Sequence, residues 1–76
     1  MPNISRKERT ARGFGKNLKA RRHEKKLGIQ ALASASGVNI GNISKMERGL
    51  GLPRVDTAWK LADALGVRLD SLRPKG

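Results

Sequence analysis

Hydrophobic side chains recur along this 76-residue chain at the spacing of α-helices, and no segment alternates as a β-strand does. Ala58, Leu61, Ala62 and Leu65 form one such stripe. β-Branched residues are few, which also disfavours strands. The pattern predicts one small all-α domain with five helices, at about residues 14–26, 29–36, 40–48 and 55–65 and a last short one around 69–72.

Residues 27–49 are predicted to hold two short helices joined by a glycine turn. Small side chains crowd the first of them, which favours close packing of the second helix against it. Asn39 is well suited to begin the second helix, because its side-chain oxygen can accept a hydrogen bond from a backbone N–H in the next turn. Ile43 and Met46 lie three residues apart and mark the buried face of that helix. A helix–turn–helix with a glycine in the turn is a DNA-docking motif whose second helix enters the major groove.

Glycine and proline positions set the expected boundaries of the domain. Pro53 prevents the residue before it from continuing a helix. Gly13 and Gly15 favour a break upstream, so residues 1–12 are predicted to form a basic, flexible N-terminal arm and residues 13–76 the helix-turn-helix domain with a short C-terminal tail. Such an arm would lie along phosphates or enter a minor groove. A backward continuation of the first helix and a disordered terminus stay open as alternatives.

Arg22 falls on the hydrophobic stripe of the first helix, four residues after Leu18. An arginine on a core-facing stripe needs a carboxylate partner, because an unpaired buried charge is very costly. Glu47 is the only acid between Glu24 and Asp56 and is therefore the predicted partner. A bidentate pair would tie the first helix to the end of the helix-turn-helix. The alternative is that both side chains face solvent, where the contact contributes little.

The chain is strongly basic, with 17 Lys and Arg against 6 Asp and Glu and a net charge of +11. Residues 6–26 alone hold ten basic and two acidic residues, so a net charge of +8 lies there. Such a balance predicts binding to a polyanion, because each neutralised phosphate releases condensed counterions. The alternative is a solvated basic helix with a soluble tail, although so concentrated a charge repels itself unless a negative partner lies nearby.

The composition gives little support to other kinds of site. The chain has no Cys and a single His, His23, so neither a disulfide nor a metal site is expected, and no cofactor or small-molecule ligand is evident. No nucleophile–base pair, paired-carboxylate site or phosphate loop indicates an enzyme. No hydrophobic run approaches the roughly 18 residues needed to span a bilayer. Because the first residues also lack the hydrophobic segment of a secretory signal, we expect a cytoplasmic protein.

A set of short motifs occurs in order along residues 13–72. They are Leu32-Ala33, Gly37-Val38, Ile43-Ser44, Glu47-Arg48-Gly49, Pro53, Asp56-Thr57, Leu61-Ala62, Ala64-Leu65-Gly66-Val67 and Leu69-Asp70-Ser71-Leu72. No single motif is specific, but the ordered set resembles the Cro/CI-type (XRE-like) helix-turn-helix family of phage repressors and small bacterial regulators. The resemblance implies a five-helix, lambda-repressor-like DNA-binding domain whose helix-turn-helix is formed by residues 29–36 and 40–48.

The resemblance also implies roles for individual positions. The helix at 40–48 would be the recognition helix, and Arg22 and Glu47 fall on the family's buried ion pair. Positions that commonly contact base edges fall on Ile40, Gly41, Asn42, Ser44 and Lys45, and positions that commonly contact phosphates fall on Asn39, Gln30, Arg48 and Arg54.

One departure from the family lies at the start of the helix at 29–36. The family usually has Ser-Gln or Asn-Gln there, whereas this chain has Gly28 and Ile29. The glutamine that often contacts phosphate is therefore missing, and Gln30 next to it is left as the candidate for that contact.

A second departure lies at the start of the recognition helix. Ile40 and Gly41 replace side chains that are often polar, and neither can hydrogen-bond a base. Ile40 can touch a thymine methyl group, and Gly41 allows close approach of the backbone. We therefore expect sparse direct readout by Asn42 and Lys45, combined with strong phosphate anchoring.

Together these features predict a bacterial or phage regulator of transcription that binds double-stranded DNA on the nucleoid. It would bind a pseudo-palindromic operator as a homodimer, with half-sites about 34 Å apart. Repression by occluding a promoter is the simplest mechanism, and activation stays open as the alternative. The predicted dimer surface lies around residues 67–72 and includes the C-terminal tail. Trp59 is expected to be partly buried, with a dimer contact as its alternative role. The alternative function is nonspecific binding of DNA or RNA through the basic arm and the helix at 14–26, although the scarcity of aromatic residues argues against single-strand stacking.

Overall fold

The computed structural model describes residues 6–72, with side chains from residue 9 onward. That part of the chain is all-α and contains no strand, as predicted. Its elements are α1 (Arg6–Glu24), α2 (Ile29–Ser36), α3 (Ile40–Glu47), α4 (Val55–Leu65) and the 3₁₀ helix η1 (Leu69–Leu72). The fifth predicted helix is thus a single 3₁₀ turn, a form that proteins use in short segments.

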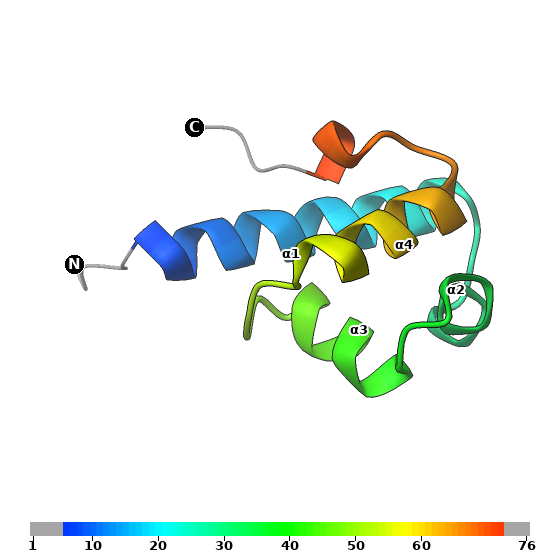
Figure 1. Ribbon diagram of the computed structural model, residues 1–76, viewed down its shortest axis with the longest axis horizontal. Coiled ribbons are helices and arrows are strands. Elements are labelled where there is room, and N and C mark those ends of the chain that lie inside the picture. The colour runs from blue at the N-terminus through cyan, green and yellow to red at the C-terminus, as the bar shows by residue number, and fades with distance from the viewer. Residues whose placement is uncertain (1–5, 73–76) are drawn as a thin grey trace.

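The longest helix, α1, runs along one axis of the molecule, with α2 and α3 on one side of it and η1 on the other (Figure 1). Both α1 and α2 contact α3, and α4 contacts α2 and η1. The side-chain amide of Asn17 on α1 donates a hydrogen bond to the carbonyl oxygen of Leu72 (3.3 Å), which joins η1 to α1. The hydrophobic residues buried most completely between these elements are Leu18, Leu32, Ile43, Leu61, Leu65 and Leu72.

The predicted start of the first helix at residue 14 is wrong, because α1 begins at Arg6 and passes through both glycines. Gly15 serves close packing here: a Cβ atom on it would lie 2.0 Å from the carbonyl oxygen of Met46. Ala11 is buried one turn earlier, which extends the hydrophobic stripe of α1 towards its N-terminus. Residues 6–12 of the expected arm are therefore helical, and residues 1–5 lie outside the described residues.

Local sequence signals account for the ends of α2 and α3. Gly37 follows α2 in the left-handed region at φ 73°, which glycine adopts without a steric penalty. Asn39 caps α3 as predicted, since its side-chain oxygen accepts a hydrogen bond from the backbone N–H of Gly41 (2.7 Å). A turn of two residues, Val38 and Asn39, thus connects Gly37 to the first residue of α3.

Candidate nucleic-acid interface

The two faces of α3 differ in burial, and this difference defines the candidate interface. Ile43 and Met46 point into the core, as their spacing predicted. Four of the five predicted base-contacting residues are exposed: Ile40, Gly41, Asn42 and Lys45. Ser44 is the exception, because it is half-buried on the side of α3 that turns towards the domain. The exposed face of α3 therefore carries one amide, one ammonium group and one hydrophobic side chain.

Asn39 and Gly41 form the N-terminal edge of this face. The side-chain oxygen of Asn39 is engaged in the cap, so its amide N–H groups remain to meet a phosphate. A Cβ atom on Gly41 would lie 3.0 Å from that oxygen, so a larger residue would crowd the cap. Gly41 thus leaves the capping bond of Asn39 undisturbed, and its lack of a side chain leaves space on the exposed side of α3.

The N-terminus of α2 offers few side chains for phosphate binding. Gly28 occupies the N-cap position and provides no side-chain hydrogen bond. Ile29 packs against the core, whereas Gln30 is exposed. The candidate phosphate ligands at this end are therefore Gln30 and the unpaired backbone N–H groups of the first turn.

Arg48 and Arg54 flank the loop that follows α3, and both side chains are exposed. Arg48 occupies the C-cap position of α3. Arg54 occupies the N-cap position of α4, where it makes no side-chain capping bond. Their guanidinium groups are thus presented to solvent on either side of the loop, a geometry suited to phosphate contacts.

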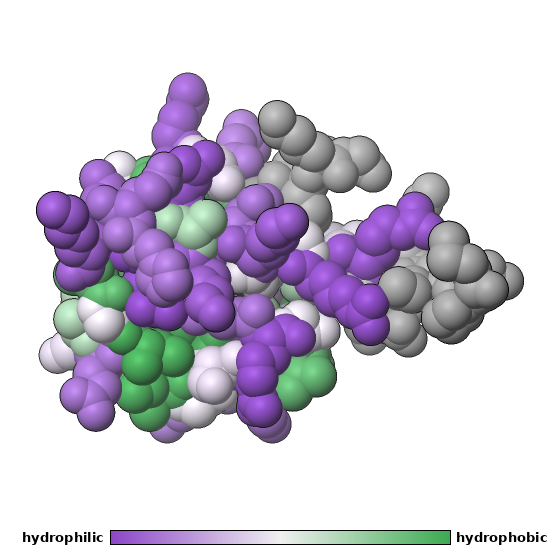
Figure 2. Space-filling model, turned by 180° about the vertical axis from the view of Figure 1, so that it is seen from behind, coloured by the Kyte–Doolittle hydropathy of each residue, from purple (hydrophilic) through white to green (hydrophobic). Residues whose placement is uncertain are grey.

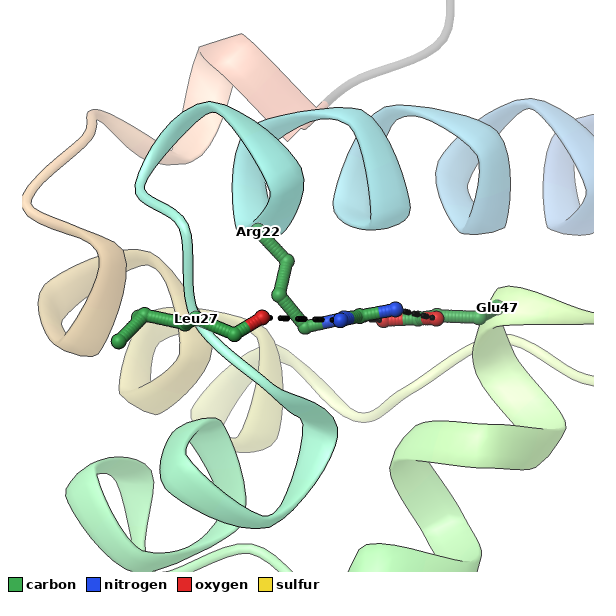
Figure 3. Close-up of polar contacts among 3 residues, drawn as sticks. All are labelled: Arg22, Leu27 and Glu47. Atoms are coloured by element: carbon green, nitrogen blue, oxygen red, sulfur yellow. Dashed lines mark hydrogen bonds and ion pairs between the residues drawn. The ribbon is translucent and has the colours of Figure 1, made fainter.

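The predicted pair of Arg22 and Glu47 is present and holds α1 to the end of α3 (Figure 3). The Nε and Nη2 groups of Arg22 donate to Oε2 and Oε1 of Glu47 at 2.7 and 2.9 Å. Its Nη1 group donates to the carbonyl oxygen of Leu27 at 2.9 Å, so the same guanidinium also fixes the connection between α1 and α2. The side chains are only 11% and 7% exposed.

The hydrogen bonds to Glu47 raise the pKa of Arg22 above its ordinary value, against the opposing effect of burial. A raised arginine pKa contributes stability that is fully present below the ordinary value and is lost only above it. Deprotonation of Arg22 therefore does not weaken the pair near neutral pH. The pair holds the first and third helices in one fixed arrangement over that range.

Several exposed hydrophobic side chains on α4 and in the loop before it were not predicted as such from the sequence. Leu50, Leu52, Val55 and Trp59 are 63%, 42%, 62% and 57% exposed. The expectation that Trp59 would be partly buried is wrong, because the buried stripe that begins at Ala58 lies on a neighbouring face of α4 and leaves Trp59 exposed. Val55 and Trp59 lie four residues apart on one helix face, and that spacing is the signal that could have identified the surface.

The segment that was expected to form the dimer surface together with the tail also contributes to the core. Val67 and Leu69 pack against the core, and Leu72 is fully buried. The tail beyond residue 72 lies outside the described residues. Across the described part of the chain, no helix is long and hydrophobic enough to cross a membrane, and no cluster of His, Cys, Asp and Glu is able to hold a metal ion.

Comparisons with known proteins agree with the helix-turn-helix arrangement described above. The HTH_3 helix-turn-helix family model matches residues 18–72. The chain is 43% identical over 63 residues to the HTH-type transcriptional repressor RghR of Bacillus subtilis (strain 168), a match that covers 82% of this chain and 47% of that protein. The chain thus spans about half the length of this relative.

Two solved structures show the same arrangement of helices. The restriction-modification controller protein C.AhdI from Aeromonas hydrophila matches with a TM-score of 0.79 and 31% identity, over 82% of this chain and 94% of that one. An HTH_3 family transcriptional regulator from Vibrio cholerae matches with a TM-score of 0.83 and 26% identity, over 87% of this chain and 37% of that one. The chain belongs to the HTH_3 helix-turn-helix family, which confirms the resemblance seen in its sequence.

Proposed function

We propose that this chain is a sequence-specific, double-stranded DNA-binding regulator that places α3 in the major groove of its operator and represses transcription by occluding a promoter. The observation that carries the proposal is the exposed face of α3, which is held rigidly by the buried pair of Arg22 and Glu47. The names of its relatives, a transcriptional repressor and a controller protein, support the same function. A cytoplasmic location on the nucleoid follows from this role.

Each exposed residue of α3 is assigned a role by its chemistry. Asn42 bonds N6 and N7 of an adenine through its amide, and Lys45 donates to a guanine or a nearby phosphate. Ile40 contacts a thymine methyl group, and Gly41 lets the backbone approach the bases. Ser44 is half-buried and contributes less than the family pattern implied. With few base-edge contacts, part of the specificity comes from the shape and deformability of the DNA.

Phosphate contacts position α3 without reading sequence. Asn39 and Gln30 provide them near the N-termini of α3 and α2, and Arg48 and Arg54 provide them on either side of the loop after α3. These residues surround the exposed face of α3 and would fix its depth and orientation in the groove.

The protein binds a pseudo-palindromic operator as a homodimer, and we assign the dimer contact to the hydrophobic surface of Val55 and Trp59 on α4. Asp56 and Lys60 lie beside these residues and carry opposite charges. Antiparallel packing of two α4 helices about a two-fold axis would bring Asp56 of one copy towards Lys60 of the other, which makes the surface self-complementary.

Sedimentation of the Trp59→Lys variant tests this dimer contact. The variant should be monomeric at concentrations where the natural chain is dimeric, with an unchanged helical content, because Trp59 is exposed in the isolated chain. An unchanged dimer in the variant would place the contact elsewhere.

Selection of bound fragments from a pool of random duplexes tests the function itself. The account predicts enrichment of one motif that is repeated with two-fold symmetry at half-site spacing. Recovery of fragments without any enriched motif would favour the alternative function, nonspecific nucleic-acid binding, which the charge of α1 alone would support.

A further inference from the structure

The exposed side of α1 carries a regular row of cations that the proposed DNA contacts do not use. Arg9, Arg12, Lys16 and Lys19 follow one another at spacings of three and four residues, so they lie on one helix face, and all four are exposed. No acidic residue occurs between Arg9 and His23. We call these four residues the basic stripe. Figure 2 shows hydrophilic side chains gathered over much of the side of the molecule that faces away from the viewer in Figure 1.

The basic stripe runs past the C-terminal end of α3. Gly15 lies so close to this end that a Cβ atom on it would meet the carbonyl oxygen of Met46 at 2.0 Å. A Cβ atom on Gly49 would lie 2.8 Å from Cγ of Arg12, so the stem of Arg12 rests on the turn that ends α3. Arg48, which is exposed, precedes that turn. The cations of α1 and those at the end of α3 therefore belong to one continuous surface.

Acidic residues elsewhere in the described chain do not neutralise this surface. Among residues with described side chains, the two ion pairs join Arg21 to Glu24 and Arg22 to Glu47, and neither involves the basic stripe. Like charges spaced along one helix face repel each other, so the stripe is destabilising unless an anion lies against it. A polyanion held beside α3 would supply that anion.

We propose that the basic stripe is a second DNA-contacting surface, which binds the phosphate backbone next to the C-terminal end of α3. The inference rests on the proposed function, because it assumes that α3 occupies the major groove. From Arg9 to Lys19 the helix rises about 15 Å, at about 1.5 Å per residue, a length over which duplex DNA presents several phosphates. Double-stranded DNA is the occupant because the stripe is continuous with the surface of α3 and Arg48.

The salt dependence of DNA binding by the intact chain tests this proposal. The variant Arg9→Gln/Lys16→Gln removes two charges from the stripe and leaves Arg12, which packs on Gly49, in place. The slope of log K against log salt concentration should become shallower by about 1.8 per chain, since each phosphate contact contributes about 0.9. Affinities for operator and for random duplex should fall by the same factor, because phosphate contacts carry no sequence information.

The matched control is Arg68→Glu, which changes the net charge by the same amount. Arg68 is exposed in the loop between α4 and η1, on the side of α1 away from α3 (Figure 1). The slope of log K against log salt concentration should be close to that of the natural chain in this control variant. Equal slopes for the stripe variant and the natural chain, or equal changes in the stripe variant and the control, would overturn the proposal.

Phosphate ethylation interference locates the contacts directly. Ethylation of particular phosphates beside the groove should interfere with binding by the natural chain but not by the stripe variant. If the stripe variant gave the same interference pattern as the natural chain, the assignment would be contradicted. It would also be contradicted if the natural chain bound duplex RNA more tightly than DNA and lost that preference in the stripe variant. If the natural chain preferred no duplex sequence, the proposed function would be refuted instead. The slope of log K against log salt concentration, measured on random DNA, would still test whether the stripe contacts phosphates.

Discussion

The helices α1 and α3 are in direct contact at Gly15, yet their exposed surfaces differ in length and in charge. α1 has 19 residues and carries the basic stripe along one face, whereas α3 has 8 residues and exposes a small face in which Lys45 is the only charged side chain. Charge binds any phosphate backbone, while an amide or a methyl group at a fixed position distinguishes one base pair from another. The contrast indicates that α1 contributes mainly to the affinity for DNA, whereas α3 distinguishes one base sequence from another. The contact between the two helices must therefore be rigid.

Among the changes to the contact between α1 and α3, loss of the buried ion pair should lower the stability of the protein most. Glu47→Ala leaves the guanidinium of Arg22 as an uncompensated charge in a site where its side chain is 11% exposed. The free energy of unfolding should fall by about 3–5 kcal/mol. Chemical denaturation measures it, with Glu24→Ala as the matched control, because the pair of Arg21 and Glu24 is exposed and should contribute at most about 1 kcal/mol. Equal losses in the two variants would mean that the buried pair does not hold the helices together.

A methyl group between the helices should have the next largest effect. Gly15→Ala places a Cβ atom 2.0 Å from a backbone oxygen of α3, so the helices must separate. The free energy of unfolding should fall by about 1–3 kcal/mol. Gly51→Ala is the control, since a Cβ atom there would meet nothing within 4 Å. A Gly15→Ala variant as stable as that control would show that the close contact is unnecessary.

Removal of the amide from α3 separates base contact from phosphate contact. Asn42→Ala should weaken operator binding by about 1–3 kcal/mol and relax the preference at one base pair, as expected for a bidentate contact. Arg54→Ala should weaken operator and random duplex alike and make the salt slope shallower. Titration of each variant against the operator and against duplexes altered at one base pair measures both effects. The assigned roles are wrong if the two variants behave alike.

The smallest predicted effect concerns the start of α3. Asn39→Ala removes the cap oxygen that accepts from Gly41 and should cost about 1 kcal/mol of stability. Asn39→Asp keeps an accepting oxygen and should remain stable, but its charge should weaken DNA binding if Asn39 faces a phosphate. Thermal melting and a binding titration on the same samples separate the two roles. Unimpaired binding by Asn39→Asp would remove Asn39 from the phosphate contacts.

Much of the fold was predictable because local signals and a single long-range inference sufficed. Asn39 marks the start of α3 because it is a favourable N-cap residue, and the spacing of the hydrophobic residues in α4 predicts its buried stripe. Glu47 was identified as the partner of Arg22 because few other acids were available. These features depend on residue chemistry that is visible in the chain itself.

Other features depend on neighbours that are distant in the sequence. Gly15 was interpreted as a helix breaker, because nothing in its own segment reveals that the end of α3 lies against it. Trp59 was expected to be partly buried because it lies one residue away from the buried stripe of α4, whereas Ala58, Leu61, Ala62 and Leu65 form that stripe without it. The basic stripe became recognisable only once α1 was known to begin at Arg6.

The ratio of affinities for operator and random duplex, measured on three proteins at one salt concentration, tests the central claim most directly. For the natural chain the account predicts a ratio of at least ~10³. The Arg9→Gln/Lys16→Gln variant should keep that ratio while binding both duplexes more weakly, and Asn42→Ala should lower it by a factor of about 5 to 150. A ratio that falls with the stripe variant and is unaffected by Asn42→Ala would contradict the division of roles between α1 and α3.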